Sequence, residues 1–127
     1  MNDNIKYWIE TSLYDLEVAE SLFKKKHYLY VAFMCHQSIE KMLKAVYVKK
    51  QNSFPPKIYN LLRLTEMSEI RPDLTQKQLV FLAELDPMNI EARYPSYKDN
   101  IRNALTKKDV KKSYSMQRSL PNGSNPV

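Results

Sequence analysis

Glycine and cysteine are almost absent from this chain, which has one of each in 127 residues. Tight β-hairpins and phosphate-binding loops rely on glycine at positive φ. Because Gly123 stands in the C-terminal segment, the preceding chain contains no Gly-rich turn, which favours helices joined by short loops and excludes Rossmann and P-loop sites. With Cys35 alone, the chain forms no intrachain disulfide and no zinc site built on several cysteines.

Long apolar runs are missing as well. No stretch of about twenty apolar residues predicts a membrane span, and Met1–Asn4 leads into an amphipathic pattern and not into a signal peptide. We therefore expect a cytoplasmic protein with no membrane association. The acidic residues do not converge, and no Glu-x-x-His pair of the kind found in di-metal helical bundles occurs. We expect no metal and no cofactor.

Positive charge is in excess, with a formal net charge of +6. Such a charge suits an anionic partner such as a nucleotide or RNA, and solubility alone explains it equally well. Lys24, Lys25 and Lys26 form a short cluster at the predicted end of a helix. The helix dipole favours cations there, and we prefer this explanation to a nucleic-acid patch, which is the alternative.

Apolar residues recur at helical spacing in successive segments. The pattern predicts helices over residues 2–26, 28–50, 56–68, 76–85 and 106–120. Prolines mark every break after the second helix, and Thr75 to Gln78 resembles a capping box. These elements predict an all-α fold, an up-and-down bundle of four to five helices over residues 1–120, followed by a disordered tail over 121–127. The residues expected to face inward from the first helix are Ile5, Trp8, Ile9, Ser12, Leu13, Leu16, Ala19 and Phe23.

The second predicted helix carries the most distinctive segment, Cys-His-Gln-Ser-Ile-Glu-Lys-Met-Leu-Lys-Ala at residues 35–45. It follows a helix containing Trp8 and Asp15-Leu16, and precedes Ala-Arg-Tyr-Pro at 92–95. In this order the motifs resemble the HEPN domain, particularly the small stand-alone prokaryotic kind, over residues 7–120. The resemblance implies a helical bundle that forms homodimers and often pairs with a minimal nucleotidyltransferase in toxin–antitoxin systems. Many members cleave RNA, and others are binding modules.

The residues that RNA-cleaving members use are not in place here. The resemblance implies an Arg followed four to six residues later by a His, the first stabilising phosphate charge and the second transferring a proton. The only histidines are His27 and His36, whereas the first arginine is Arg63. No histidine follows Arg93 or Arg102, so the sequence argues against metal-independent RNase activity and names no catalytic residue.

Polar residues of the motif and of the later loop are the candidates for binding a nucleotide or partner: Gln37, Glu40, Lys41, Lys44, Arg93 and Tyr94. Glu40 and Lys44 are predicted to form an i,i+4 pair. The four residues on the helix form either a solvated face, which we prefer, or a dimer groove that receives a nucleotide. Arg93 either binds phosphate or carboxylate, or fixes its loop onto the bundle through a carboxylate such as Glu40. The lone His36 could contact phosphate, although such a histidine is more often packed.

Three functions follow. The leading hypothesis is a non-enzymatic HEPN protein that binds a nucleotide or a cognate nucleotidyltransferase, as in a toxin–antitoxin pair. The second is an RNA-cleaving toxin with an atypical site, in which Arg93 or Arg102 binds phosphate and Tyr94 or Tyr97 replaces histidine. The third is a structural, dimeric helical adaptor.

Overall fold

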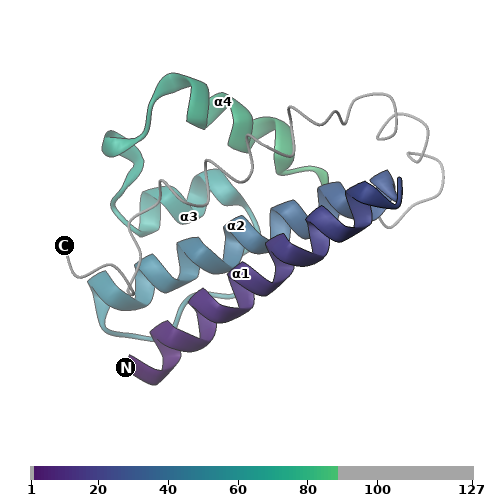
Figure 1. Ribbon diagram of the computed structural model, residues 1–127. Coiled ribbons are helices and arrows are strands. Elements are labelled where there is room, and N and C mark those ends of the chain that lie inside the picture. The colour runs from purple at the N-terminus through teal and green to yellow at the C-terminus, as the bar shows by residue number, and fades with distance from the viewer. Residues whose placement is uncertain (1, 89–127) are drawn as a thin grey trace.

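The computed structural model describes residues 2–88, which contain four α-helices and one short 3-10 helix (Figure 1). The order is α1 (Asn2–Lys24), α2 (Tyr28–Gln51), α3 (Leu61–Met67), η1 (Arg71–Asp73) and α4 (Gln76–Leu85). No strand occurs within residues 2–88, and the predicted all-α bundle is confirmed. The predicted helix over 106–120, the predicted tail and the loop with Arg93 and Tyr94 lie outside the described residues.

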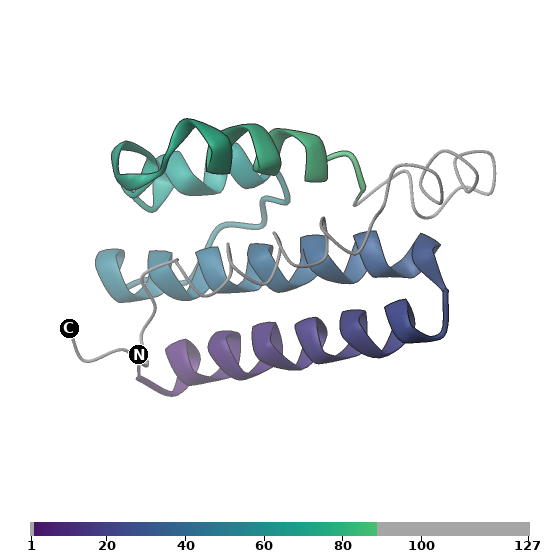
Figure 2. The ribbon, with the colours of Figure 1, turned by 45° about the horizontal axis from the view of Figure 1, so that its top comes forward.

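Helix α2 lies at the centre of the fold. Helices α1 and α2 form a long antiparallel hairpin, and α3 and α4 cover the side of α2 that faces away from α1 (Figures 1 and 2). The core therefore draws on all four α-helices, and its fully buried side chains include Ile39, Met42, Leu43, Leu61, Leu64 and Leu82. Burial of each such side chain contributes about 1.5–3 kcal/mol of transfer free energy. None of these helices is long and apolar enough to cross a membrane.

Two serines hold α1 close to α2. The Ser12 hydroxyl donates to the Ser38 backbone carbonyl at 2.6 Å, and the Ser38 hydroxyl donates to the Ser12 carbonyl at 2.8 Å. Both residues are fully buried. A second contact joins the same two helices: Lys41 Nζ of α2 lies 2.6 Å from Asp15 Oδ2 of α1. Small side chains at the crossing let the two backbones approach, and the reciprocal bonds satisfy both buried hydroxyl groups.

The predicted inward face of α1 is correct except at one residue. Ile9, Ser12, Leu16 and Ala19 are buried, whereas Leu13 is 50% exposed. Ser12 faces α2, where it bonds to Ser38, and Leu13 is rotated a further 100° around the helix axis. Leu13 consequently lies on the outer surface of the hairpin.

The first, second and fourth predicted helices have almost the observed bounds, but the third does not. Helix α3 begins at Leu61 and not at Pro56. Asn60 is its N-cap, and its side chain accepts a hydrogen bond from the backbone N–H of Arg63 at 2.9 Å. Residues 52–60 therefore form a loop that crosses beside α2. The capping box predicted at Thr75 is present, with bonds in both directions between Thr75 and Gln78.

Three helix ends use residues other than glycine in the left-handed region. Lys26, Asn52 and Glu69 have φ of 64°, 50° and 61°. After α1, the N–H of His27 bonds to the Leu22 carbonyl at 2.9 Å and that of Lys26 to the Phe23 carbonyl at 3.0 Å. This pattern is a Schellman motif, in which glycine is the usual left-handed residue. The scarcity of glycine thus does not remove such turns from this protein.

Candidate functional site on helix α2

The motif segment of α2 faces the interior over most of its length. Ile39, Met42 and Leu43 are at most 1% exposed, as predicted for core residues. Cys35 is also buried, which confirms its predicted packing role. Tight packing on both sides of α2 leaves its polar side chains little access to water, and they interact mostly with one another and with neighbouring helices.

Glu40 and Lys44 form the predicted i,i+4 pair, with Lys44 Nζ 3.0 Å from Glu40 Oε2. Their exposed fractions are only 4% and 6%, so the preferred interpretation of this face as solvated is wrong for both residues. The helix pattern did not reveal that Trp8 and the loop residue Tyr59 lie against the Lys44 ammonium group. Lys44 Nζ lies 5.6 Å from the centroid of the Trp8 ring and 5.4 Å from that of Tyr59. Two cation–π contacts thus replace part of the hydration of the ammonium group.

His36 connects α2 to the two short helices. Its Nε2 lies 3.1 Å from Asp86 Oδ1, and the same oxygen accepts the backbone N–H of Leu61 at 3.1 Å. A carboxylate that accepts one N–H is best satisfied by a second donor, so Nε2 carries the ring proton. Asp86 thereby joins the middle of α2, the first residue of α3 and the end of α4.

Burial controls the protonation of His36, whose side chain is fully enclosed. Loss of hydration lowers the pKa of His36 below its ordinary value of 6.5, and this outweighs the opposing effects of the Asp86 hydrogen bond, the Glu40 and Asp86 charges and the Tyr59 backbone. The imidazole is therefore neutral at pH 7. A buried neutral histidine held by a carboxylate has a structural role and not the exposed position that phosphate binding requires.

Two buried acceptors in this network have no hydrogen-bond partner among the described residues: His36 Nδ1 and Glu40 Oε1. The two atoms face each other at 3.7 Å. With the ring proton on Nε2, neither of them can donate to the other. A donor from elsewhere would satisfy both, and a guanidinium has the required planar set of N–H groups. The predicted anchoring of Arg93 to Glu40 matches this requirement and stays a prediction.

The remaining candidates are not brought together with the buried pair. Lys41 is partly exposed and forms an ion pair with Asp15 of α1, and Gln37 is partly exposed. Arg93 and Tyr94 lie outside the described residues. Within residues 2–88, no group of three or more His, Cys, Asp or Glu side chains is arranged to hold a metal ion.

The order of helices and the position of the motif agree with a comparison against protein families. A family model of the HEPN domain matches residues 5–120. This chain belongs to the HEPN-domain family. Neither the curated proteins nor the solved structures contain a significant match to it.

The site of this HEPN protein includes residues that sequence analysis missed. Asp86 is 50 residues from its partner His36 along the chain, and Tyr59 belongs to a segment predicted to be helical. No local pattern marks either of them, because both act through contacts that exist only after α3 and α4 pack on α2. The sequence predicted that Trp8 faces inward. It did not predict the contact of Trp8 with Lys44, because that lysine was expected to be solvated and is buried.

Proposed function

We propose that this HEPN-domain protein is a non-enzymatic binding protein that binds a nucleotide or a nucleotidyltransferase partner, as a component of a toxin–antitoxin-like pair. The position of His36 carries the proposal. It is the histidine beside the motif, and it is fully buried, neutral and bound to Asp86. It therefore cannot exchange protons with an RNA ribose, and no arginine precedes it to stabilise a phosphate.

The distribution of charge supports an anionic ligand. Residues 89–127 contain eight Lys and Arg but only three Asp and Glu, so +5 of the formal net charge of +6 belongs to this part of the chain. Arg93 and Tyr94 stand at its start, and an arginine with a neighbouring aromatic residue suits a nucleotide through phosphate contact and base stacking. An asymmetry of this kind points to a polyanionic partner more strongly than the overall charge does.

Thermal denaturation with and without ATP, GTP, CTP and UTP tests the proposal. We expect at least one nucleotide to raise Tm, because a ligand that binds only the folded state stabilises it. Arg93→Ala should abolish this rise while Arg71→Ala, on an exposed arginine paired with Glu66, should not. The proposal is wrong if no nucleotide changes Tm and the protein does not bind a nucleotidyltransferase encoded beside it.

The same Arg93→Ala variant separates the two predicted roles of that arginine. If Arg93 binds the ligand, Tm without nucleotide stays unchanged. If Arg93 supplies the donor missing at Glu40 Oε1, Tm without nucleotide falls, since the substitution leaves a buried carboxylate oxygen unpaired. Glu40→Gln should then lower Tm in the wild-type background much more than in the Arg93→Ala background.

An exposed apolar strip on α1 favours the adaptor hypothesis as the second candidate. Leu13 and Tyr14 are 50% and 65% exposed, and Tyr7 lies two turns before Tyr14 on the same side of the helix. Large apolar side chains in this arrangement are typical of protein interfaces. A homodimer formed through this strip is compatible with nucleotide binding, and light scattering with nucleotide titration on the same sample tests each independently.

A further inference from the structure

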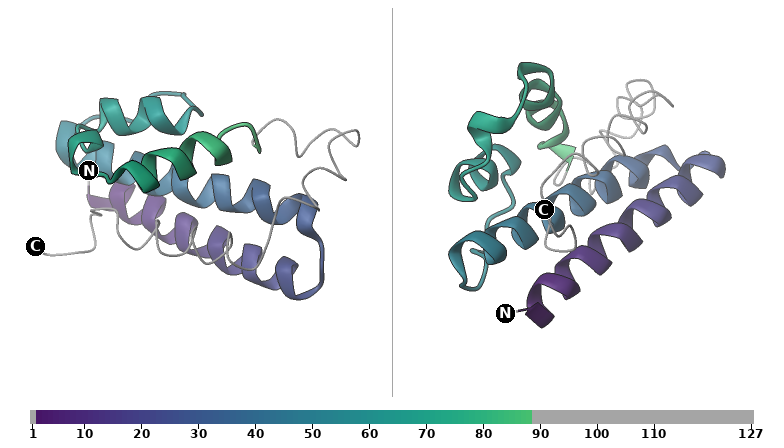
Figure 3. Two further views of the ribbon diagram at one scale, coloured as in Figure 1. Left: turned by 90° about the horizontal axis from the view of Figure 1, so that it is seen from above. Right: turned by 60° about the vertical axis from the view of Figure 1, so that its left-hand side comes forward.

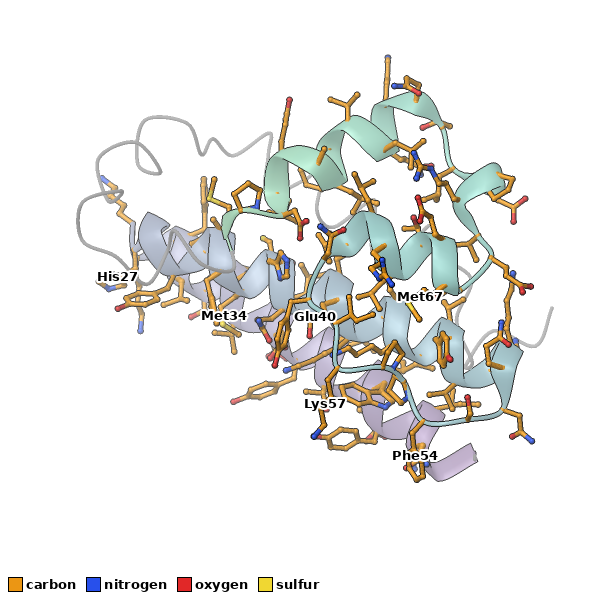
Figure 4. The ribbon with its side chains drawn as sticks, turned by 180° about the vertical axis from the view of Figure 1, so that it is seen from behind. His27, Met34, Glu40, Phe54, Lys57 and Met67 are labelled. Carbon is orange, nitrogen blue, oxygen red and sulfur yellow. The ribbon has the colours of Figure 1, made fainter. Side chains whose placement is uncertain are left out.

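The turn between α1 and α2 is a strongly basic part of the described surface. It contains Lys24, Lys25, Lys26 and His27, all exposed. The hairpin extends past α3 and α4, so this turn projects beyond the other described helices (Figures 1 and 3). Figure 4 shows His27 at this tip, well separated from Glu40. We use the name basic tip for residues 24–27 together with Tyr30.

The dipole of α1 explains only part of this cluster. Helix α1 ends at Lys24, so Lys25 and Lys26 follow its last turn, where the dipole effect declines. Lys26 occupies the left-handed position of the Schellman motif. A lysine is a costly choice there, since glycine or asparagine would adopt φ of 64° with less strain. The turn therefore has a lysine, Lys26, at a position where the backbone conformation favours glycine or asparagine.

The charge of the tip is not neutralised within the described part of the chain. None of the three lysines forms an ion pair with residues 2–88. No Asp or Glu occurs between Glu20 and Glu40 in the sequence, and the first turn of α2 has no acidic residue. Unpaired lysines that project into solvent produce a positive potential that attracts polyanions and falls with ionic strength.

Tyr30 indicates which polyanion fits. Its side chain is 55% exposed in the first turn of α2, four residues after Lys26, and its backbone N–H bonds to the His27 carbonyl at 3.2 Å. An exposed ring next to several ammonium groups can stack on a base while the lysines contact phosphates, which is the mode by which single strands bind. A membrane surface would instead be met by exposed aliphatic side chains. The exposed side chains of the tip, residues 24–27 and Tyr30, are three lysines, one histidine and one tyrosine, and none of them is an aliphatic hydrocarbon.

We propose that the basic tip is a binding site for single-stranded nucleic acid, with Lys24, Lys25 and Lys26 on the phosphates and Tyr30 stacked on a base. It is separate from the α2 motif at residues 35–45, as His27 and Glu40 show in Figure 4. It does not depend on the proposed nucleotide-binding function. Each can fail without the other, because one is measured with mononucleotides and the other with oligonucleotides.

Fluorescence anisotropy with a labelled oligouridylate tests the site. Replacing the three lysines together (Lys24→Gln, Lys25→Gln and Lys26→Asn, the last to keep a residue that tolerates positive φ) should weaken binding by roughly tenfold to a hundredfold at low salt. The slope of log K against log salt should become shallower by about 2, because each neutralised phosphate of a single strand contributes about 0.7 to that slope. The matched control removes three exposed lysines elsewhere, Lys49→Gln, Lys50→Gln and Lys57→Gln, and should retain most of the affinity.

Tyr30 distinguishes specific engagement from general attraction to charge. Tyr30→Ala should weaken single-strand binding by about tenfold or more without changing the salt slope, and Tyr30→Phe should restore it, as expected for base stacking. A duplex of the same length should bind the wild type and Tyr30→Ala equally. Circular dichroism of each variant confirms that it is folded.

Three results would overturn the proposal. The first is equal oligouridylate affinity for wild type and the triple tip variant. The second is an equal reduction of affinity in the Lys49, Lys50 and Lys57 control, which would show that only net charge matters. The third is binding of the tip to vesicles of phosphatidylserine and phosphatidylcholine, abolished in the triple tip variant, with no binding to oligouridylate.

Discussion

At the level of single residues, His36 couples folding to pH. The folded protein holds His36 neutral because burial lowers its pKa, whereas the unfolded chain takes up a proton near pH 6.5. The unfolded state therefore binds more protons as the pH falls, and the folded state loses stability relative to it. The contribution of His36 is complete above pH 6.5 and declines as the pH falls through that value towards the lower folded pKa.

We expect urea denaturation to show this loss between about pH 7.5 and 5.5, the range in which a free histidine becomes charged. His36→Gln should be less stable at pH 7.5 and show a flatter pH profile. The charged groups that face His36 are Asp86 and Glu40, the second neutralised by Lys44. His27→Gln, on the exposed histidine, should retain the wild-type profile. Equal pH dependence in wild type and His36→Gln would contradict this assignment.

Glu40 and Lys44 provide a second test at this scale. A buried ion pair contributes little in itself, but removal of one partner leaves the other charge buried and costs about 3–5 kcal/mol. Lys44→Met should therefore lower the free energy of unfolding severely. The double variant Lys44→Met with Glu40→Gln should be more stable than Lys44→Met alone, because it removes the unpaired carboxylate. Additive losses in this double-mutant cycle would show that the two side chains do not interact.

At the level of elements, the sequence predicted helix starts and inward faces correctly wherever a local signal defines them. Thr75 and Gln78 identified the start of α4, and the apolar stripe of α2 identified its inward face. Prolines misled the prediction of α3, because a proline can begin a helix but does not require one. The helix begins five residues after Pro56, at Leu61, where the Asn60 side chain caps it. Network members such as Asp86 were not predictable, since their partners come from distant segments.

The end of α3 makes a prediction about strain. Glu69 has φ of 61° in a Schellman motif, with the Ile70 N–H bonded to the Thr65 carbonyl at 3.1 Å. A residue with a Cβ atom is disfavoured in this conformation by about 1 kcal/mol, and glycine is not. Glu69→Gly should therefore raise the free energy of unfolding by up to about 1 kcal/mol. Lys77→Gly, at an exposed position in the first turn of α4 with ordinary helical geometry, is the control and should not raise it.

At the scale of the whole molecule, the outer surface of α1 predicts association. Leu13→Glu places a charge beside Tyr14 in the exposed apolar strip and should shift a dimer to monomer in light scattering, because an interface core disfavours unpaired charge. Glu84→Lys, on an exposed position of α4 away from the strip, is the matched control. A protein that is already monomeric at micromolar concentration would remove the basis for this interface.

The family was recognisable before the structure because its motif residues are mostly core residues, and core packing specifies a bundle. The candidate site was harder to predict, since the same motif residues can form either a solvent-exposed polar face or a buried network of polar side chains. Only the packing of α3, α4 and the 52–60 loop on α2 decides between them, and for Glu40 and Lys44 it selects the enclosed arrangement.

The fluorescence of Trp8 can report how the 52–60 loop packs on α2. It is the single tryptophan of the chain, and its indole lies beside the Lys44 ammonium group, with Tyr59 of the loop on the same cation. Movement of the loop away from α2 would change the water and charge around the indole without unfolding the helices. The emission of the unmodified protein therefore reports the closure of that loop, while circular dichroism reports the helices, and a difference between the two unfolding curves would measure how independently the loop opens.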